Sequence, residues 1–409
     1  MMHGLWLVAL SVVAAQGCSD FLLNRTNETI SARTMDFTLD LNAHLEIVPR
    51  GTRLREPPAQ NCANNCSSYA WDATYGFVSV NAYGANVAMD GLNEAGLSAA
   101  WLWLDATTYR TTDAMDPRPV VTSVVSHLLG TCASVDDVRA KLATIQVAEI
   151  DPTRLIMFAP GTPVIESYPL HVAVHDASGR SLVLEILNQT LHVYENPNGV
   201  LTNDPPLLDQ LAALASATSL PSGYGSTERF VRLSMLNRHR DRVYDPTTSY
   251  GAASSEQAAV ASAVHFLGTV QTPLAGDNGG GTEFALVRDH ARRKLYFQST
   301  QNLNLRMVDL SRIDFAPGAK RRALAVTFGR WVDDVTDALV ASTTHSKYIP
   351  NRSHLDKAFD SRSTQLAPPT FRGSIPTIVV VVGASIGAVS VIGVALLRES
   401  NRQGYTHVG

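Results

Sequence analysis

The sequence predicts an α+β protein in which β-sheets are covered by helices. Short apolar segments suited to strands occupy residues 18–104, two helical segments follow within residues 117–145, and further strands and helices continue to about residue 315. Strand blocks separated by pairs of helices are typical of this class. With 409 residues, 45% of them hydrophobic, the chain can bury a sizeable core.

The first block of expected strands consists of short apolar segments bounded by turns. These strands are Cys18–Leu23, Thr29–Phe37, His44–Val48, Phe77–Tyr83, Val87–Met89 and Leu97–Leu104. Helices are then expected over Pro117–Leu129 and Val135–Ile145. Ser134 and Asp137 have the spacing of a capping box, which predicts where the second helix begins.

The second half of the chain predicts a meander, two helices and a hairpin. The meander strands are His171–His175, Leu182–Leu187 and Leu191–Tyr194, the helices are Glu228–Leu236 and Glu256–Val270, and the hairpin joins Phe284–Val287 to Lys294–Phe297. The compact part is expected to end near Phe315 or shortly after.

Residues 1–17 resemble a secretory signal peptide. The apolar stretch Leu5–Ala15 is followed by Gly17, so small residues stand at the two positions that signal peptidase inspects. Cleavage would fall directly before Cys18. The alternative for this segment is a buried helix.

Residues 375–397 are an uncharged apolar run, about long enough to cross a bilayer, and Arg398 and Arg402 follow it. We expect a globular domain over residues 18–342, a polar stalk over 343–374, this transmembrane helix, and a cytoplasmic tail over 398–409. The chain would then be a single-pass type I membrane protein of the secretory pathway, with its body in the lumen or outside the cell. Sequons at Asn24, Asn27, Asn65, Asn188 and Asn351 are compatible with a glycoprotein.

Charge and cysteine content narrow the function. The net charge of −4 is small for the length, so nucleic acid is not an expected partner. Among the 4 cysteines, Cys62 and Cys66 could form a local bridge and Cys132 lies in a helical stretch, which leaves Cys18 over.

A cysteine placed directly after a cleavage site has a specific chemical use, because its freed α-amino group can act as the general base for its own thiol. The reference pKa values of the two groups are about 8, so a proton can pass between them near neutral pH. Cys18 is therefore a candidate N-terminal nucleophile.

Several motifs occur in the order of a known family. They are Cys18–Phe21, Ala32–Phe37, Asp90–Leu97, Ala173–Asp176, Val200–Pro205, Glu228–Arg232, Thr282–Phe284 and Val287–His290. With this set the sequence resembles the choloylglycine hydrolase and penicillin V acylase family of N-terminal-nucleophile hydrolases. The resemblance implies an αββα four-layer sandwich, hydrolysis of a linear C–N amide bond in a small N-acyl substrate, and no metal or organic cofactor.

The same resemblance implies roles for five residues. Cys18 would attack the carbonyl, Arg33 would favour its thiolate, and Asp36 would orient the α-amino group. Asn203 would donate to the developing oxyanion, and Arg229 would belong to the supporting network. Taken singly, each has a plainer explanation: a surface salt bridge for the arginines, and a turn for Asp36 and Asn203.

Two departures from the bile-salt hydrolases limit what is carried over. Trp103 aligns with a family asparagine, and we expect it to act through its backbone N–H while its ring reshapes the acyl pocket; core packing is the alternative. The segment between Asn203 and Arg229 is short, so the tetramer interface of those enzymes is not expected and the oligomeric state stays open. The chain looks closer to the penicillin-acylase-like branch of Gram-negative bacteria.

Alternatives to this enzyme remain open at this point. A lipid amidase acting on N-acylethanolamine or ceramide-like substrates would suit a membrane anchor, and a catalytically idle surface glycoprotein would keep the fold for binding. His171, His175 and His290 lack metal-ligand spacing, so we interpret them as core or surface residues.

Overall fold

The computed structural model describes residues 17–25, 28–38, 40–60, 69–82, 87–113, 115–151, 167–238, 254–273 and 281–339. The chain divides into two compact units, Met1–Ala358 and Phe359–Gly409, and every described residue lies in the first. The predicted stalk, transmembrane segment and tail lie outside the described residues, as do Cys62, Cys66 and nearly all of the predicted signal peptide. Among the helices that are described, none is long and apolar enough to cross a membrane.

One sheet contains six antiparallel strands in the order β14-β1-β2-β15-β16-β17. Its strands are β1 (Ser19–Arg25), β2 (Glu28–Phe37), β14 (Val200–Thr202), β15 (Gly281–Asp289), β16 (Lys294–Ser299) and β17 (Asn302–Asp309). β2 is buried along nearly its whole length, because both of its faces and both of its edges are covered.

A second sheet contains eight strands in the order β13-β12-β11-β8-β7-β6-β3-β18. They are β3 (His44–Val48), β6 (Phe77–Asn81), β7 (Ala88–Asn93), β8 (Ser98–Trp103), β11 (Leu170–His175), β12 (Ser181–Leu187), β13 (Thr190–Glu195) and β18 (Arg322–Ala325). Smaller elements are the pair β4 (Arg53–Arg55) and β5 (Ala70–Asp72), the pair β9 (Val120–Val121) and β10 (Gln146–Val147), and two 3₁₀ turns, η1 (Leu310–Arg312) and η2 (Thr336–Ala338).

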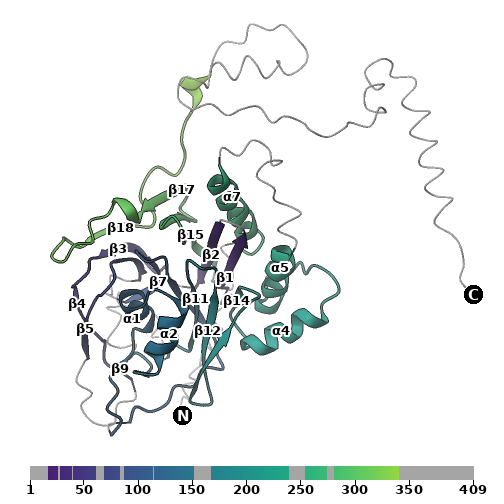
Figure 1. Ribbon diagram of the computed structural model, residues 1–409. Helices are drawn as coiled ribbons and strands as arrows, with labels where there is room; N and C mark the ends of the chain where they lie inside the picture. Colours follow the sequence, from purple (N-terminus) through teal and green to yellow (C-terminus); the bar gives the residue numbers. More distant parts are fainter. Residues whose placement is uncertain are drawn as a thin grey trace, which may run out of the picture. The chain divides into compact units, whose positions relative to one another are not determined.

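Helices cover the outer faces of both sheets (Figure 1). Three of them lie with the six-stranded sheet: α4 (Leu207–Ser216), α5 (Ser226–Arg238) and α7 (Ser255–Gly268). α7 packs on β2 and β15, α5 packs on β1 and β14, and α4 packs on α5. On the eight-stranded sheet, α1 (Val124–Thr131) packs on β6, β7 and β8, and α2 (Val135–Leu142) joins the same apolar cluster.

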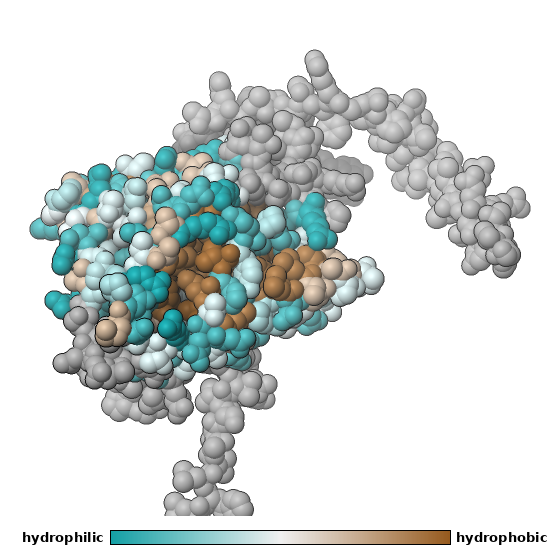
Figure 2. Space-filling model, turned by 60° about the horizontal axis from the view of Figure 1, so that its bottom comes forward, coloured by the Kyte–Doolittle hydropathy of each residue, from teal (hydrophilic) through white to brown (hydrophobic). Residues whose placement is uncertain are grey.

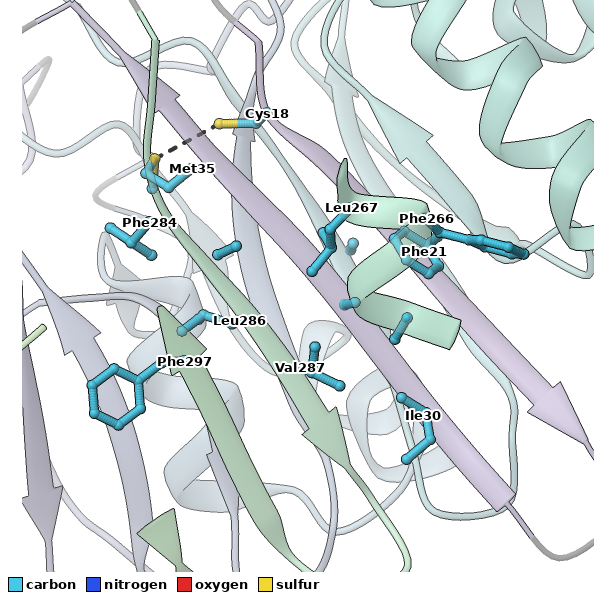
Figure 3. Close-up of a cluster of buried hydrophobic side chains, with 14 of the residues drawn as sticks. Cys18, Phe21, Ile30, Met35, Phe266, Leu267, Phe284, Leu286, Val287 and Phe297 are labelled. Carbon is cyan, nitrogen blue, oxygen red and sulfur yellow. Dashed lines mark hydrogen bonds between the residues drawn. The ribbon is translucent and has the colours of Figure 1, made fainter. Parts of the chain in front are cut away.

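The larger hydrophobic core joins both sheets to helices α5 and α7. Figure 3 shows Phe21 of β1 beside Phe266 of α7, with ring centroids 6.0 Å apart, and Met35 beside Cys18. Phe21 is fully buried, and burying such a side chain stabilises the fold by roughly 1.5–3 kcal/mol. The core therefore holds the N-terminal strand, and with it Cys18, in place.

The α+β class is confirmed, and each expected strand and helix has a counterpart in the structure. The capping box of Ser134 and Asp137 is present. The Pro117–Leu129 helix was wrong in extent: Val120–Val121 is a strand and α1 begins at Val124, because Pro117 and Pro119 disfavour helical backbone before them.

Several elements were missing from the sequence-based expectation. Helix α4 and strands β4, β5, β9, β10, β14, β17 and β18 were not predicted. β18 pairs with β3, so the sheet extends to Ala325, shortly after Phe315, and the compact part was expected to end near Phe315 or shortly after. Of the sequon residues, Asn188 is exposed in the β12–β13 turn with φ 49°.

Candidate active site

Cys18 directly precedes β1 and belongs to the larger hydrophobic core, which contains residues of both sheets. Antiparallel pairing sets Ser19 opposite Thr34, so Cys18 comes next to Met35 and Asp36 at the end of β2. Its Sγ is 3.7 Å from Sδ of Met35 (Figure 3). The same sulfur is 3.6 Å from Nη2 of Arg33 and 3.8 Å from the carbonyl oxygen of Asp36. The β1–β2 hairpin alone therefore gathers the first residues of the site.

Arg33 is fully buried and links the two sheets. Its Nη1 donates to Asp90 Oδ2 at 3.1 Å and to the carbonyl of Met89 at 3.2 Å, and its Nη2 also donates to the carbonyl of Trp101. Burial opposes the charge, but Cys18 and Asp90 outweigh burial and raise the pKa of Arg33 above its ordinary value. A permanent positive charge therefore stands beside the sulfur.

A chain of buried charges continues behind Arg33. Arg288 on β15 donates from Nε to Asp90 Oδ1 at 2.9 Å and from Nη1 to Asp20 Oδ2 at 3.1 Å. His175 of the other sheet contacts Asp20 Oδ1 through Nε2 at 2.5 Å. Burial raises the pKa of Asp20, yet Arg288 and His175 outweigh it, so the net shift is downward. Paired charges of this kind fix the position of Arg33 against both sheets.

Asp36 lies directly against the residue that precedes the candidate nucleophile. A Cβ at Gly17 would collide with the Asp36 carboxylate, so this carboxylate borders the backbone on which the α-amino group of Cys18 would be freed. Thr282 Oγ1 donates to Oδ1 of Asp36 at 2.6 Å, and Thr272 Oγ1 donates to Oδ2 at 3.3 Å. Burial raises the pKa of Asp36 to about 6, although the charge of Arg229 and these hydrogen bonds act against it.

Arg229 on α5 joins three other parts of the site. Its Nη1 donates to the carbonyls of Gly17 and Cys18, the latter at 2.7 Å, and to Oγ of Ser19 at 2.6 Å. Its Nη2 donates to Oδ1 of Asn203 at 3.2 Å. Burial lowers the pKa of Arg229, while Asp36 and Cys18 act in the opposite direction. The side chain thus connects the N-terminal backbone to Asn203.

Asn203 follows β14 and is buried. With Oδ1 occupied by Arg229, its Nδ2 faces the other way and donates to the carbonyl of Trp103 at 3.1 Å. Trp103 is half-buried, its Nε1 donates to Asp105 at 2.5 Å, and its ring packs edge-on against Tyr168. The contact between these two site residues runs through the carbonyl of Trp103; its expected role as a backbone N–H donor stays a prediction.

A cavity borders the threonines that hold Asp36, and one face of the molecule carries an apolar patch. Thr272 and Thr282, which hold Asp36, also line a cavity of about 330 Å³ together with Phe284, Gln298 and Leu303. Figure 2 shows one face of the molecule, on which apolar side chains gather around a hollow bordered by hydrophilic surface. A hollow with apolar side chains at its centre and hydrophilic surface at its border is suited to an amphiphilic small molecule.

Comparison with known proteins indicates the family. The family model for linear amide C–N hydrolases, choloylglycine hydrolase family, matches residues 18–216, so the match begins at Cys18. Over this stretch the chain is similar to the family. It is an amide hydrolase that acts on linear C–N bonds.

Two relatives of known sequence are similar to most of the chain. Penicillin V acylase from Pectobacterium atrosepticum is 26% identical over 341 residues, which cover 76% of this chain and 86% of the relative. A bile salt hydrolase/transferase from Lactiplantibacillus plantarum is 24% identical, covering 68% of this chain and 88% of the relative.

Two solved structures show the same fold. Penicillin V acylase from Agrobacterium tumefaciens has a TM-score of 0.60 at 24% identity, covering 75% of this chain and 91% of the other. A variant of the conjugated bile acid hydrolase from Clostridium perfringens also has a TM-score of 0.60, at 17% identity, covering 75% and 97%.

Five residues singled out in the sequence form one connected group. Hydrogen bonds and close contacts join Cys18, Arg33, Asp36, Asn203 and Arg229. The three histidines do not join them in a ligand set: among the described residues no group of three or more His, Cys, Asp or Glu side chains is arranged to hold a metal. His171 pairs with Glu185, His175 pairs with Asp20, and His290 contacts Ser31.

Sequence reasoning missed the residues that support this group. Asp90, Thr282 and Arg288 lie within motifs that carry the resemblance, so their positions were visible although their contacts were not. Gln210 had no such signal, because the helix that carries it was not predicted. Asn93, at the end of β7, stabilises the turn that follows it, because its Oδ1 accepts from the N–H groups of Ala95 and Leu97.

Proposed function

We propose that the mature chain begins at Cys18 and that the Cys18 thiolate attacks the carbonyl of a small N-acyl amide. The thiolate adds to the carbonyl carbon, the C–N bond breaks, and the amine leaves with a proton from the α-ammonium group of Cys18. Water, deprotonated by the same α-amino group, then hydrolyses the thioester and releases the carboxylic acid. The step draws on no cofactor.

The observation that carries this proposal is the position of Asp36 against Gly17. Once residues 1–17 are removed, the new α-amino group lies where the Gly17 backbone borders the Asp36 carboxylate. Asp36 then orients that group toward Sγ, as a carboxylate orients the base in other activated-nucleophile sites. That the family match begins at Cys18 supports the same starting point.

Arg33 and Asn203 provide the remaining electrostatics in this proposal. The guanidinium of Arg33, 3.6 Å from Sγ, favours the ionised sulfur. The Nδ2 of Asn203, oriented by Arg229 through Oδ1 at 3.2 Å, donates to the oxyanion as negative charge develops. The Asn203 interaction strengthens as negative charge moves onto the oxygen in the transition state, so it accelerates the chemical step, whereas Arg33 acts before the attack, by stabilising the negative charge on the sulfur.

The substrate class follows from the relatives, a penicillin V acylase and bile salt hydrolases/transferases. We include lipid amides of the N-acylethanolamine and ceramide type on the substrate panel, because the proposal also places the chain in the secretory pathway. In that part of the proposal residues 375–397 anchor a glycosylated, lumenal or extracellular enzyme to a membrane. The apolar, uncharged character of that segment supports this placement.

The chemistry is tested with substitutions at the two ends of the mechanism. Cys18→Ser is expected to lose most activity, since a hydroxyl ionises far less readily than a thiol, and Cys18→Ala is expected to lose essentially all of it. Asn203→Ala is expected to lower kcat by about 10²–10³ with little change in KM. Steady-state kinetics on a panel of penicillin V, conjugated bile salts and N-acylethanolamines measures both. An active Cys18→Ala protein, or a kcat for Asn203→Ala within about threefold of the parent, would overturn the corresponding role.

A further inference from the structure

Gln210 lies on helix α4, which was not predicted, and its side chain makes several hydrogen bonds to the backbone of residues 202–205. Its side chain is fully buried. Oε1 accepts from the N–H of Thr202 at 3.2 Å and from its hydroxyl at 3.1 Å. Nε2 donates to three carbonyls, of Thr202 at 3.3 Å, Asn203 at 2.6 Å and Pro205 at 2.6 Å. One side chain thus satisfies buried polar groups on both sides of Asn203.

The pattern of these contacts selects a primary amide. The three carbonyl oxygens require hydrogen-bond donors, while the N–H of Thr202 requires an acceptor, and only the amide of Asn or Gln offers two N–H donors together with an acceptor. A carboxylate would face three carbonyl oxygens, and an apolar side chain would leave them buried without partners. The same argument fixes which end of the Gln210 amide is nitrogen.

Helix α4 is itself held firmly at the point where it follows the Asn203 segment. Its first residue, Leu207, is buried and donates its N–H to Oε1 of Glu185 on β12 at 2.8 Å. The same Glu185 oxygen contacts His171 Nδ1 at 3.2 Å. Gln210 is therefore mounted on a helix that is fixed to the eight-stranded sheet, while β14 belongs to the six-stranded sheet.

These contacts bear directly on the direction of the Asn203 amide. Arg229 and Trp103 contact the side chain of Asn203, at 3.2 Å and 3.1 Å. A shift of about 1 Å in a catalytic group can cost roughly 10²-fold in rate. The backbone around Asn203 therefore needs its own support, and Gln210 contacts it at residues 202, 203 and 205.

We propose that Gln210 is a positioning residue for the amide hydrolysis, which fixes the backbone of residues 202–205 so that Nδ2 of Asn203 points at the oxyanion. This inference rests on the proposed function, because it requires Asn203 to be the oxyanion donor. Gln210 itself touches neither substrate nor Cys18. Its loss should therefore lower the rate of the chemical step and leave substrate binding and the reactivity of Cys18 nearly unchanged.

The test uses the full chain with two substitutions and a matched control. Gln210→Met removes every polar contact, and Gln210→Glu keeps the shape and the acceptor but can donate at most one hydrogen bond, when protonated. The control is Gln146→Met. Gln146 on β10 also donates hydrogen bonds to three carbonyls of one loop. Its Nε2 contacts those of Asp113, Asp116 and Arg118 at 3.3, 3.4 and 2.8 Å. β9, the partner of β10, lies well apart from α4 (Figure 1).

Two measurements are made on each protein: kcat and KM on a turned-over substrate, and the rate at which iodoacetamide captures Cys18. Both Gln210 variants are expected to lose at least about tenfold in kcat, with KM within about threefold and the alkylation rate within about twofold of the parent. The control is expected to retain the parental kcat. When Gln210→Met is added to Asn203→Ala, kcat should fall by less than about a further threefold, because the side chain that Gln210 positions is already gone.

Each contrary outcome has a definite meaning. A kcat within about threefold of the parent for both Gln210 variants, while Asn203→Ala loses about 10² or more, overturns the inference alone. A fall in kcat that is accompanied by a comparable rise in KM and a comparable fall in the alkylation rate also overturns the inference, since such changes together report general loss of structure. If Asn203→Ala itself retains parental kcat, the oxyanion assignment fails, and the inference falls with it.

Discussion

Neutralising Asp36 is expected to stabilise the unprocessed protein while abolishing its activity. Burial raises the pKa of Asp36 from 3.8 to about 6 in the chain that retains Gly17. Ionising this carboxyl therefore costs more in the folded than in the unfolded chain. Between pH 4 and 6 the folded state binds more protons than the unfolded state. The stability that protonated Asp36 contributes is therefore fully present below its unfolded pKa and is lost as the pH rises through about 6.

The magnitude follows from the same two values. The pKa of Asp36 rises from 3.8 in the unfolded chain to about 6 in the folded chain. At pH 7.5 this shift lowers the free energy of unfolding by about 3 kcal/mol, and at pH 5 by about half of that. Asp36→Asn resembles the protonated carboxyl and can still accept a hydrogen bond from Thr282. The full chain with Gly17 in place should therefore become about 3 kcal/mol more stable at pH 7.5 when it carries Asp36→Asn.

The assay is urea denaturation of parent and Asp36→Asn at pH 7.5 and pH 5, with activity measured after processing. Taking the difference between the two proteins cancels every other titrating group. Processing should shrink the stability gain, because the new α-ammonium group gives the Asp36 carboxylate an opposite charge. A variant that is less stable than the parent at pH 7.5, or a gain that is equal at both pH values, would refute this reasoning.

Three further predictions concern the sulfur, the core and the anchor. Arg33→Ala should slow alkylation of Cys18 by iodoacetamide at neutral pH, since the adjacent positive charge is lost; an unchanged rate contradicts its role. Phe21→Ala should lower the free energy of unfolding by about 3–5 kcal/mol in a urea titration, because it empties a fully buried site against Phe266; a loss below about 1 kcal/mol contradicts the packing. The full chain should stay with membranes through a carbonate wash, whereas a chain stopped near Thr343 should be secreted and active; failure of that chain to fold would make the C-terminal segments part of the catalytic unit.

Local signals in the sequence explain why much of the site could be predicted. Cys18, Arg33 and Asp36 lie on one hairpin, whose short strands and turn are encoded in neighbouring residues. Antiparallel pairing brings such residues together whatever the rest of the chain does. Their roles came from the resemblance, because residue type and spacing alone left a salt bridge or a turn as the plainer explanation.

The supporting contacts could not be predicted, since they depend on how separate elements pack. Asp90 and Arg288 are 198 positions apart and meet only because the two sheets stack. Helix α4 begins directly after Pro205 and Pro206, whose sequence indicates a turn, and it places Gln210 beside Asn203. No local pattern marks a single glutamine that will be buried among three carbonyls.

The central claim is that Cys18 becomes the N-terminal residue of the active enzyme, and the mass of the mature chain tests it most directly. Full-length protein is expressed in cells with a secretory pathway, purified by its amidase activity, deglycosylated and analysed by intact mass together with N-terminal sequencing. The account predicts that the active material begins at Cys18 with a free α-amino group. Fully active protein that retains Gly17, or that begins at any other residue, would contradict the mechanism.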